Sequence, residues 1–378
     1  MTRKIRVLQL QLRYNVSASD LAEQVIEGLP PDRFEVTTAF LRGEPGPGEP
    51  ESRARRSIYF RFRQSDLKGL KRFVALWRVY KHCRESSYDV VIAHRFKPTN
   101  MLMLMNRLLR IPACIGVQHS IGDYERPYRR WEARHLLTPN WRIVAVSRAV
   151  RQYLLDCGAG FVSRNTVQIN NAIDIERAER LQHSRERARD ALGLQHGKFV
   201  FGTIGRLVPV KGHVNLIEAF AMLQADHPEV DVVIIGEGRM RAQLEEIIER
   251  NRLQGRVHLP GAREDALQYV RAFDAFIMPS VSEGLPLALL EGMSGHLPVI
   301  GSDIDSLRPI LEDCGGRVFP VGDSRGLSQQ MRAVLALDDD QRRAEGERAY
   351  AYLRSAHAIE NFRGQYRKLI EDLIRVPQ

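Results

Sequence analysis

Cysteine is scarce in this chain, and long uninterrupted apolar runs are missing from it. The 378 residues include four cysteines that stand far apart and form no CxxC pair: Cys83, Cys114, Cys157 and Cys314. This spacing supports neither a disulfide framework nor a zinc site, so we expect reduced thiols. The longest apolar stretch, residues 101–117, is interrupted by Asn106, Arg107 and Arg110 and is too polar to span a bilayer. The N-terminus has no signal-peptide pattern, and a cytoplasmic protein is expected.

Strands and helices alternate along the sequence, whereas internal repeats and low-complexity tracts are absent from it. Apolar strands separated by helices are typical of a parallel sheet covered on both faces. We expect strands at residues 5–12, 34–41, 89–93, 111–118 and 142–146, and then at 199–204, 230–236, 257–259, 273–278 and 298–301. We expect helices at residues 18–29, 67–80, 214–223 and 239–252, and a charged, helix-prone connector at 176–192.

A length of 378 residues suits two domains of ordinary size. We therefore predict an α/β protein with two tandem Rossmann-like domains at residues 1–170 and 196–355, joined by a linker at 171–195. Ligands of open α/β sheets bind beyond the carboxyl ends of the strands, so a cleft between the domains is the expected site.

Positive charge is concentrated in the first half of the chain. Residues 1–170 hold 29 Lys and Arg against 15 Asp and Glu, a net charge of +14, whereas residues 171–378 carry −4. The densest part runs from Arg53 to Arg72. This asymmetry favours a polyanionic partner such as anionic lipid headgroups, a phosphorylated glycan or nucleic acid. Nucleic acid is not expected, because the basic stretch has no RNP, zinc-finger or helix-turn-helix signature.

Two carboxylates flank a predicted strand-to-helix turn in the segment PSVSEGLPLALLEG, residues 279–292. Pro286 stands where a first helical residue would. Glu283 lies on the turn, and Glu291 lies about one and a half turns into the helix. Between them are the free N–H groups of a helix N-terminus, which attract anions. This arrangement suits a nucleotide sugar, although a capping Glu on a solvated helix face would give the same pattern.

A second loop places two cations at the carboxyl end of a predicted strand. The segment GRLVPVKG, residues 205–212, directly follows the strand at 199–204. The guanidinium fork of Arg206 and the point charge of Lys211 suit a diphosphate, and they would neutralise the charge that grows on a leaving nucleotide. The plainer alternative is two surface cations on a loop.

The order of these segments resembles the retaining glycosyltransferases of family four, which have the GT-B fold. The resemblance rests on G-R-L-x3-K-G after one strand, G-E-G after the next, and P-S-x-S-E-G-L-P-L-x3-E-G followed by P-V-I, within residues 198–325. A strand that ends in Ser147 and the segment Asn171-Ala172-Ile173-Asp174 are similar to the end of the family's first domain and to its linker. Residues 362–366 resemble its terminal helix, which implies that residues 356–378 cross back to the first domain.

The resemblance implies a role for each residue that matches. Arg206 and Lys211 would bind the donor diphosphate, and Glu291 would accept hydrogen bonds from the ribose. Glu283, with the backbone of Gly284 and Leu285, would position the transferred sugar. A lone histidine after a strand is more often structural, but His119 matches the family's histidine near the donor sugar; His94 is an acceptor-side or structural candidate. The catalytic candidates are Arg206, Lys211, Glu283 and His119, and the donor-binding candidates are Glu291, Gly284, Leu285, Gly205 and Gly236.

Retention of anomeric configuration, which the family implies, constrains the chemistry. Retaining glycosidases place two carboxylates on opposite faces of the sugar, whereas Glu283 and Glu291 share one loop and helix. We therefore expect the carboxylates to position the donor, the cations to stabilise the leaving group, and the acceptor hydroxyl to attack on the same face. The only co-substrate expected is the nucleotide sugar, with no metal or other cofactor, because Asp303-Ile304-Asp305 follows a strand of the second half and lacks a metal-binding context.

Two departures from the family pattern leave the first loop and the nucleotide base open. Residues 12–17 replace a Gly-Gly pair, although Arg13 or Tyr14 could contact the acceptor, and residues 305–308 replace G-G-x-x-E. The leading interpretation is hexosyl transfer to a glycan or glycolipid in lipopolysaccharide core or other envelope polysaccharide synthesis, at the inner face of the cytoplasmic membrane. The alternatives are a GT-B nucleotide-sugar epimerase and a non-catalytic nucleotide-sugar-binding protein.

Overall fold

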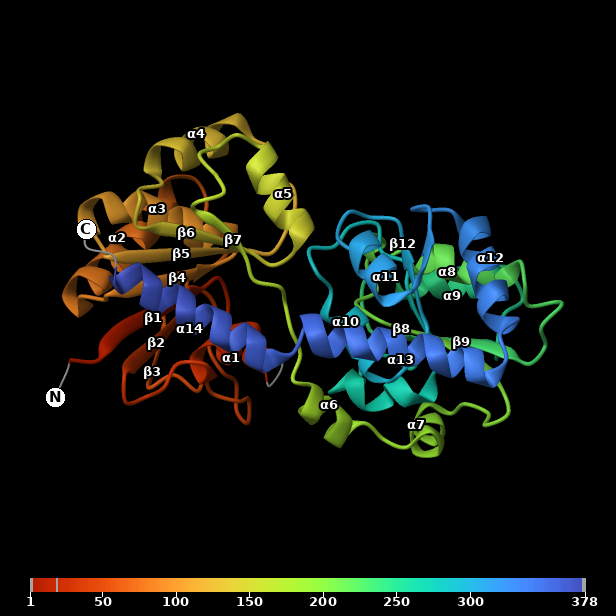
Figure 1. The fold of residues 1–378 in the computed structure, drawn as a ribbon. Helices are drawn as coiled ribbons and strands as arrows, with labels where there is room; N and C mark the ends of the chain where they lie inside the picture. The colour runs from red at the N-terminus through yellow and green to blue at the C-terminus, as the bar shows by residue number, and fades with distance from the viewer. Residues whose placement is uncertain (1–2, 18–19, 376–378) are drawn as a thin grey trace. The chain divides into compact units, whose positions relative to one another are not determined.

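A computed structural model describes residues 3–17 and 20–375, and these form two compact units. The first unit lies within residues 1–171 and 359–378, and the second comprises residues 172–358. Each unit is built on one parallel sheet with helices on its faces (Figure 1). The predicted α/β class with two Rossmann-like sheets is confirmed.

The first unit has seven parallel strands in the order β3-β2-β1-β4-β5-β6-β7, a doubly wound order with one additional edge strand. Its strands are β1 (Ile5–Gln11), β2 (Phe34–Phe40), β3 (Arg56–Tyr59), β4 (Val90–His94), β5 (Ala113–Gln118), β6 (Trp141–Ala145) and β7 (Thr166–Gln168). Its helices are α1 (Leu21–Glu27), η1 (Gly69–Lys71), α2 (Arg72–Ser86), α3 (Phe96–Leu109), α4 (Pro127–Leu136), α5 (Arg148–Asp156) and α14 (Ile359–Arg375). The first two residues of the helix predicted at 18–29 lie outside the described residues.

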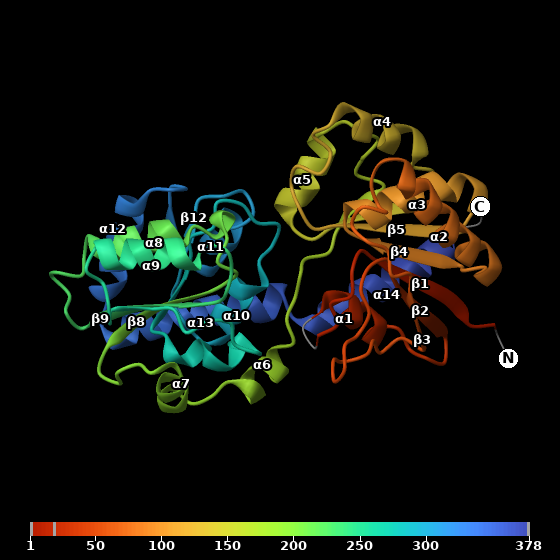
Figure 2. The ribbon, with the colours of Figure 1, turned by 180° about the vertical axis from the view of Figure 1, so that it is seen from behind.

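The last helix, α14, belongs to the core of the first unit. Phe362, Tyr366 and Ile370 recur at one-turn spacing and are almost fully buried. The helix packs against α1, and the Arg363 guanidinium pairs there with Glu27. Figures 1 and 2 show α14 on one face of the sheet and α2 and α3 on the other.

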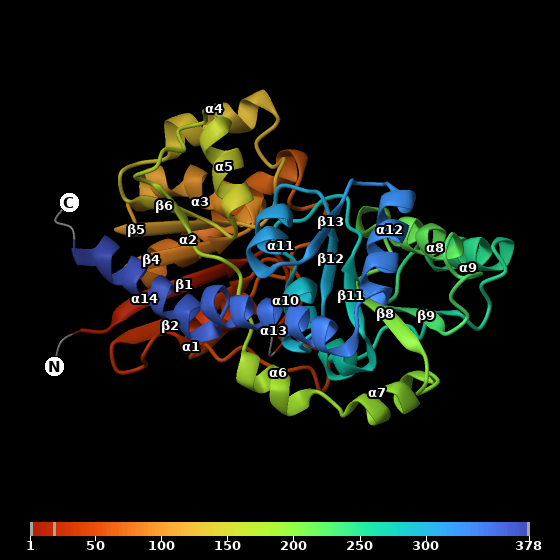
Figure 3. The same ribbon diagram turned by 45° about the vertical axis from the view of Figure 1, so that its right-hand side comes forward.

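The second unit has six parallel strands in the order β10-β9-β8-β11-β12-β13. The strands are β8 (Phe199–Ile204), β9 (Val230–Ile235), β10 (Val257–His258), β11 (Ala275–Met278), β12 (Val299–Ser302) and β13 (Arg317–Phe319). The helices are α6 (Ile175–Leu181), α7 (Arg185–Leu192), η2 (Pro209–Lys211), α8 (His213–Ala221), α9 (Arg241–Arg250), η3 (Ala266–Ala272), α10 (Leu287–Ser294), α11 (Arg308–Cys314), α12 (Ser324–Leu335) and α13 (Asp339–Ala356). Figure 3 shows helices on both faces of this sheet. One apolar cluster lies under α8, α9 and α12, and the other lies under α10, α11 and α13.

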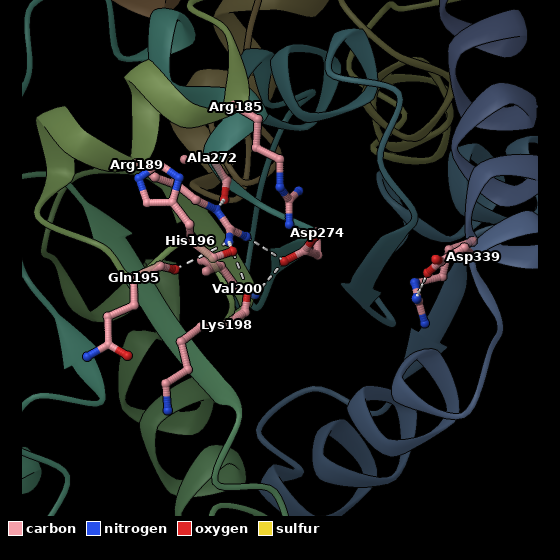
Figure 4. Close-up of polar contacts among 10 residues, drawn as sticks. Arg185, Arg189, Gln195, His196, Lys198, Val200, Ala272, Asp274 and Asp339 are labelled. Carbon is pink, nitrogen blue, oxygen red and sulfur yellow. Dashed lines mark hydrogen bonds and ion pairs between the residues drawn. The ribbon is translucent and has the colours of Figure 1, made fainter.

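The expected linker at 171–195 is packed into the second unit by a buried arginine. Arg189 of α7 is fully buried, and its guanidinium donates to Asp274, to the Ala272 carbonyl and to three carbonyls between residues 195 and 198 (Figure 4). Asp274 also accepts a 2.7 Å bond from the backbone N–H of Val200 in β8. The buried charge is therefore compensated, and it ties α7 to the segments that lead into β8 and β11.

The helix predicted at 67–80 turns four of its large apolar residues outward. The residues of α2 that are buried are small, Ala75, Val79 and Cys83, which lets the helix approach its neighbours closely. On the opposite side the exposed fractions are 84% for Leu70, 58% for Phe73, 62% for Val74 and 60% for Trp77. The spacing of these residues predicts a helix with one apolar side, but it does not identify the side that faces the core.

The basic stretch at 53–72 is not a single solvated run. It contains the edge strand β3, which the sequence pattern does not predict because the strand has only four residues, two of them polar, and none is fully buried. Arg53, Arg55 and Arg61 form ion pairs with the carboxylates of Glu27, Glu35 and Glu44. Among the described residues, the cations of this stretch that form no ion pair are Arg56, Arg63, Lys68, Lys71 and Arg72, and most of them lie toward α2. None of the described helices has the length and apolar character that a membrane crossing requires.

Candidate active site

The carboxyl ends of β8 and β11 form the topological switch point of the second sheet. These neighbouring strands are flanked by β9 and β12, so the chain leaves them toward opposite edges. The loop at 205–212 follows β8, and the loop at 279–286 follows β11. The Val281 N–H donates to the Val210 carbonyl at 2.8 Å and joins the two loops. Doubly wound sheets bind ligands at such a point.

Close backbone approaches at two glycines hold the loops of this site together. A Cβ atom on Gly236 would lie 1.9 Å from the Gly205 carbonyl oxygen, and one on Gly212 would lie 1.9 Å from that of Pro279. Gly212 also has a φ of +67°, which favours glycine. Gly205 differs from both, because a Cβ there would meet nothing closer than 3.6 Å. Packing within the protein therefore explains glycine at 236 and 212, but not at 205.

Two of the predicted catalytic side chains meet across these loops. Lys211 Nζ donates to Glu283 Oε1 at 2.5 Å, and both side chains are mostly buried. Arg206, in the same loop as Lys211, is exposed and forms no ion pair within the part of the chain that the structure describes. Of these two cations, Lys211 is therefore paired with a carboxylate, and Arg206 is exposed.

The helix whose N-terminus lies at this site is α10. Pro286 is its N-cap, so the helix begins one residue later than the sequence analysis expected. No side chain caps it, which leaves N–H groups of the first turn for a ligand. Gly284 and Leu285 lie in the loop immediately before the helix, and Leu285 is buried. This arrangement is an anion cradle directly beside Glu283.

Glu291 is half-buried in the fifth position of α10. Burial raises the pKa of its carboxyl to about 7; the negative charge of Asp265 adds to the increase and Arg177 opposes it. Its surroundings therefore disfavour the ionised form until hydrogen-bond donors approach. Ribose hydroxyls are donors of that kind. His213, at the start of α8, is also buried, and burial lowers its pKa to about 4, so it is neutral at pH 7.

His119 and His94 lie in the first unit, beyond the ends of neighbouring strands. Their ring centroids are 6.1 Å apart, and His94 Nε2 is 2.6 Å from Gln9 Oε1. Burial, with lesser effects of neighbouring charge, lowers the pKa of each ring to about 3, so both are neutral at pH 7. His119 Nε2 is buried, and no other described residue forms a hydrogen bond with it.

A small pocket of about 80 Å³ occupies the switch point of the first sheet, between β1 and β4. Besides the two histidines, Arg13, Asn15, Asp20 and Arg95 line it. Burial raises the pKa of Asp20 to about 6. Tyr14 does not line the pocket, because its hydroxyl donates to the Pro50 carbonyl. The sequence pattern did not single out Asp20 and Arg95; the position of Asp20 as N-cap of the helix after β1 was the available signal.

The segment Asp303-Ile304-Asp305 is not arranged as a metal site. The Arg308 guanidinium donates to both carboxylate oxygens of Asp303. Within residues 3–17 and 20–375, no three His, Cys, Asp or Glu side chains gather closely enough to hold a metal ion.

Comparison with known proteins places both halves in one family. The family model described as Glycosyltransferase Family 4 matches residues 19–177, and the model described as Glycosyl transferases group 1 matches residues 184–352. An Escherichia coli UDP-Gal:α-D-GlcNAc-diphosphoundecaprenol α-1,3-galactosyltransferase is 25% identical over 80% of each chain. A D-inositol 3-phosphate glycosyltransferase of Corynebacterium urealyticum is 25% identical over 77% of this chain and 73% of its own.

A solved structure of similar fold is that of Anabaena HepE in complex with UDP. It has a TM-score of 0.82 and 20% identity, and the match covers 97% of this chain and 100% of HepE. The chain therefore belongs to the retaining glycosyltransferases of group 1 and family four, GT-B enzymes that transfer a sugar from a nucleotide-sugar donor.

Proposed function

We propose that this chain transfers a hexose from a nucleoside-diphosphate sugar to a glycan or glycolipid of the cell envelope, with lipopolysaccharide core as the preferred context. One observation supports the donor side most strongly. Lys211, Glu283 and the uncapped N-terminus of α10 lie together at the switch point of the second sheet. Uridine is the first base to test, because the Escherichia coli relative is named for UDP-galactose and HepE was solved with UDP.

The proposed roles follow from the charges and burial of these residues. The donor diphosphate takes the place of Glu283 on Lys211, and Arg206 adds a second cation to it. Glu283 is then free to accept hydrogen bonds from the sugar hydroxyls beside Gly284 and Leu285. Glu291 accepts from the ribose. The two cations stabilise the leaving diphosphate while the acceptor hydroxyl attacks the same face of the sugar.

The first unit is proposed to receive the acceptor. The supporting observation is the pocket between β1 and β4, which Asp20 and Arg13 line together with two histidines whose imidazoles are neutral at pH 7. A carboxyl whose pKa is raised to about 6 suits hydrogen bonding to a sugar hydroxyl. The assignment of His119 to the donor sugar stays a prediction, as does a position at the inner face of the cytoplasmic membrane.

The test begins by measuring how much UDP-, GDP-, ADP- and dTDP-sugars raise the melting temperature of the full chain. The stabilising donor is then incubated without acceptor and the products are identified. Hydrolysis to sugar and nucleotide with retained configuration supports the transferase, whereas release of an epimerised nucleotide sugar supports the epimerase. Tight binding of a donor that is never turned over supports a binding protein instead.

Two substitutions test the donor site itself. Glu291→Ala is expected to weaken donor binding, because it removes the ribose acceptor. Lys211→Ala is expected to reduce turnover mainly, because it removes charge stabilisation of the leaving group. Full activity in both variants would show that the donor lies elsewhere.

A further inference from the structure

A pocket of about 480 Å³ in the first unit is lined by α2, α3 and α4 and is strongly basic. It lies apart from the pocket between β1 and β4 and shares no lining residue with it. Its five cations are Lys68, Arg72, Lys97, Arg126 and Arg129, and no carboxylate lines it. Such a cavity attracts an anion that offers several oxygen atoms.

The positive charge in this pocket is not neutralised by ion pairs among the described residues, although the charge of Arg129 also acts on the carboxyl of Asp123. In the described part of the chain, none of the five cations forms an ion pair with a carboxylate. Arg129 is nevertheless fixed in position, because its guanidinium lies 4.1 Å from the Phe96 ring centroid and donates to the Asp123 carbonyl at 2.7 Å. Burial lowers the pKa of Lys97, and the positive charges of Lys68, Arg42 and Arg129 lower it further. An anion in the pocket would relieve this repulsion.

An exposed apolar strip adjoins the pocket. It consists of Leu70, Phe73, Val74 and Trp77, each more than half exposed. Arg72 and Leu76 of α2 line the pocket, and the next residues around the helix are Phe73 and Trp77. On α4, Tyr128 and Trp131 are exposed as well. Figure 2 shows α2, α3 and α4 on the same face of the sheet.

We propose that this face docks on an anionic bilayer, with the phosphate of a phospholipid headgroup in the five-cation pocket and the strip Leu70, Phe73, Val74 and Trp77 in the headgroup–acyl boundary. Cations beside exposed Trp and Tyr match the chemistry of a membrane interface. A cation pocket with no acidic residue is complementary to anionic lipid, and the exposed aliphatic residues Leu70 and Val74 have no counterpart on a nucleic acid. The inference extends the proposed membrane-associated role, but the donor chemistry does not depend on it.

The test is co-sedimentation of the full chain with phosphatidylcholine vesicles that contain or lack phosphatidylglycerol. Lys68→Gln with Arg126→Gln removes two exposed pocket cations without disturbing the core. Each cation near an anionic surface contributes roughly fivefold in affinity, so a loss of about 25-fold is expected. The matched control is Arg187→Gln with Arg250→Gln, two exposed arginines of the second unit, which should bind as the parent does.

The apolar strip has its own matched pair of substitutions. Leu70→Ser should weaken vesicle binding about tenfold, because an exposed leucine no longer enters the bilayer. Met222→Ser removes an exposed apolar side chain of the second unit, outside the proposed docking face, and should have no effect. Soluble glycerol phosphate at raised concentration should compete only partially, because it occupies the pocket and leaves the strip free.

Equal binding to neutral vesicles, equal losses in the test and control variants, or binding to nucleic acid in preference to vesicles would each overturn the inference. Donor hydrolysis is measured on the same samples. If hydrolysis persists without vesicle binding, only this inference fails; if vesicle binding persists without hydrolysis, only the proposed function fails.

Discussion

Lys211 and Glu283 form an ion pair 2.5 Å long that joins the loop after β8 to the loop after β11. Both side chains are mostly buried, so the pair is weakly screened by salt. A donor diphosphate that binds Lys211 must compete with a carboxylate already in place. The same displacement frees Glu283 to contact the sugar, so donor binding and sugar positioning are coupled through one contact.

Glu283→Gln should therefore bind free UDP more tightly than the parent, by about tenfold, while sugar transfer falls. The reason is that Lys211 loses its neutralising partner, whereas the sugar loses a charged acceptor. Calorimetric titration with UDP and a transfer assay measure the two effects. In the double variant with Lys211→Ala, the gain in affinity should vanish. Weaker binding of UDP by Glu283→Gln would contradict the competition.

Gly205→Ala and Gly236→Ala should distinguish a glycine required for donor binding from a glycine required for the stability of the fold. Gly236→Ala is expected to lower the melting temperature clearly, because its Cβ collides with the Gly205 carbonyl at 1.9 Å. Gly205→Ala should melt like the parent, since its Cβ makes only ordinary contacts, and yet it should bind the donor more weakly. If Gly205→Ala melts early, glycine at 205 serves the fold and not the ligand.

Glu291 should make the stability of the second unit depend on pH. Its carboxyl has a pKa near 4.5 when unfolded and about 7 when folded. Between these values the unfolded state ionises while the folded state keeps its proton, so stability falls as pH rises through this window, by about 3 kcal/mol at most.

Glu291→Gln should remove this loss of stability at high pH. Its melting temperature should exceed the parent's at pH 8 and nearly equal it close to pH 4.5. Glu249→Gln, at an exposed position of α9, controls for the removal of one negative charge. If both variants differ from the parent in melting temperature by the same amount at every pH, the pH dependence does not come from Glu291.

Arg189→Met should destabilise the second unit by roughly 3 to 5 kcal/mol, because Asp274 would keep its buried charge without its main partner. Arg185 bonds the same carboxylate at 2.5 Å but is half exposed, so Arg185→Met should cost less than about 1 kcal/mol. Denaturant unfolding of both variants gives the comparison. Similar losses would mean that burial of Arg189 contributes nothing beyond the ion pair.

The sequence predicts most of the donor site because of how parallel sheets are built. Buried parallel strands can be recognised in the sequence as continuous apolar runs. The residues that follow each such strand must lie at the same edge of the sheet. Arg206, Lys211 and Glu283 could therefore be grouped from the chain alone. The pairing of Lys211 with Glu283 was not predicted, since no periodicity records which loop residues turn toward each other.

Other features were missed for equally physical reasons. The edge strand β3 has four residues, and β7 and β13 have three residues each, too few for a visible alternation. The pocket residues Asp20 and Arg95 come from segments 75 positions apart that meet only when β1 and β4 pair. The outward direction of Phe73 and Trp77 depends on the small residues behind them.

The position of α14 has a consequence for how the molecule is made. Phe362, Tyr366 and Ile370 complete the core of the first unit, yet the ribosome adds them after every residue of the second unit. The amino-terminal sheet emerges early with the surface meant for α14 uncovered. We expect the second unit to finish folding before the first during synthesis, so chaperones would meet the amino-terminal half as the late, aggregation-prone part of a nascent chain.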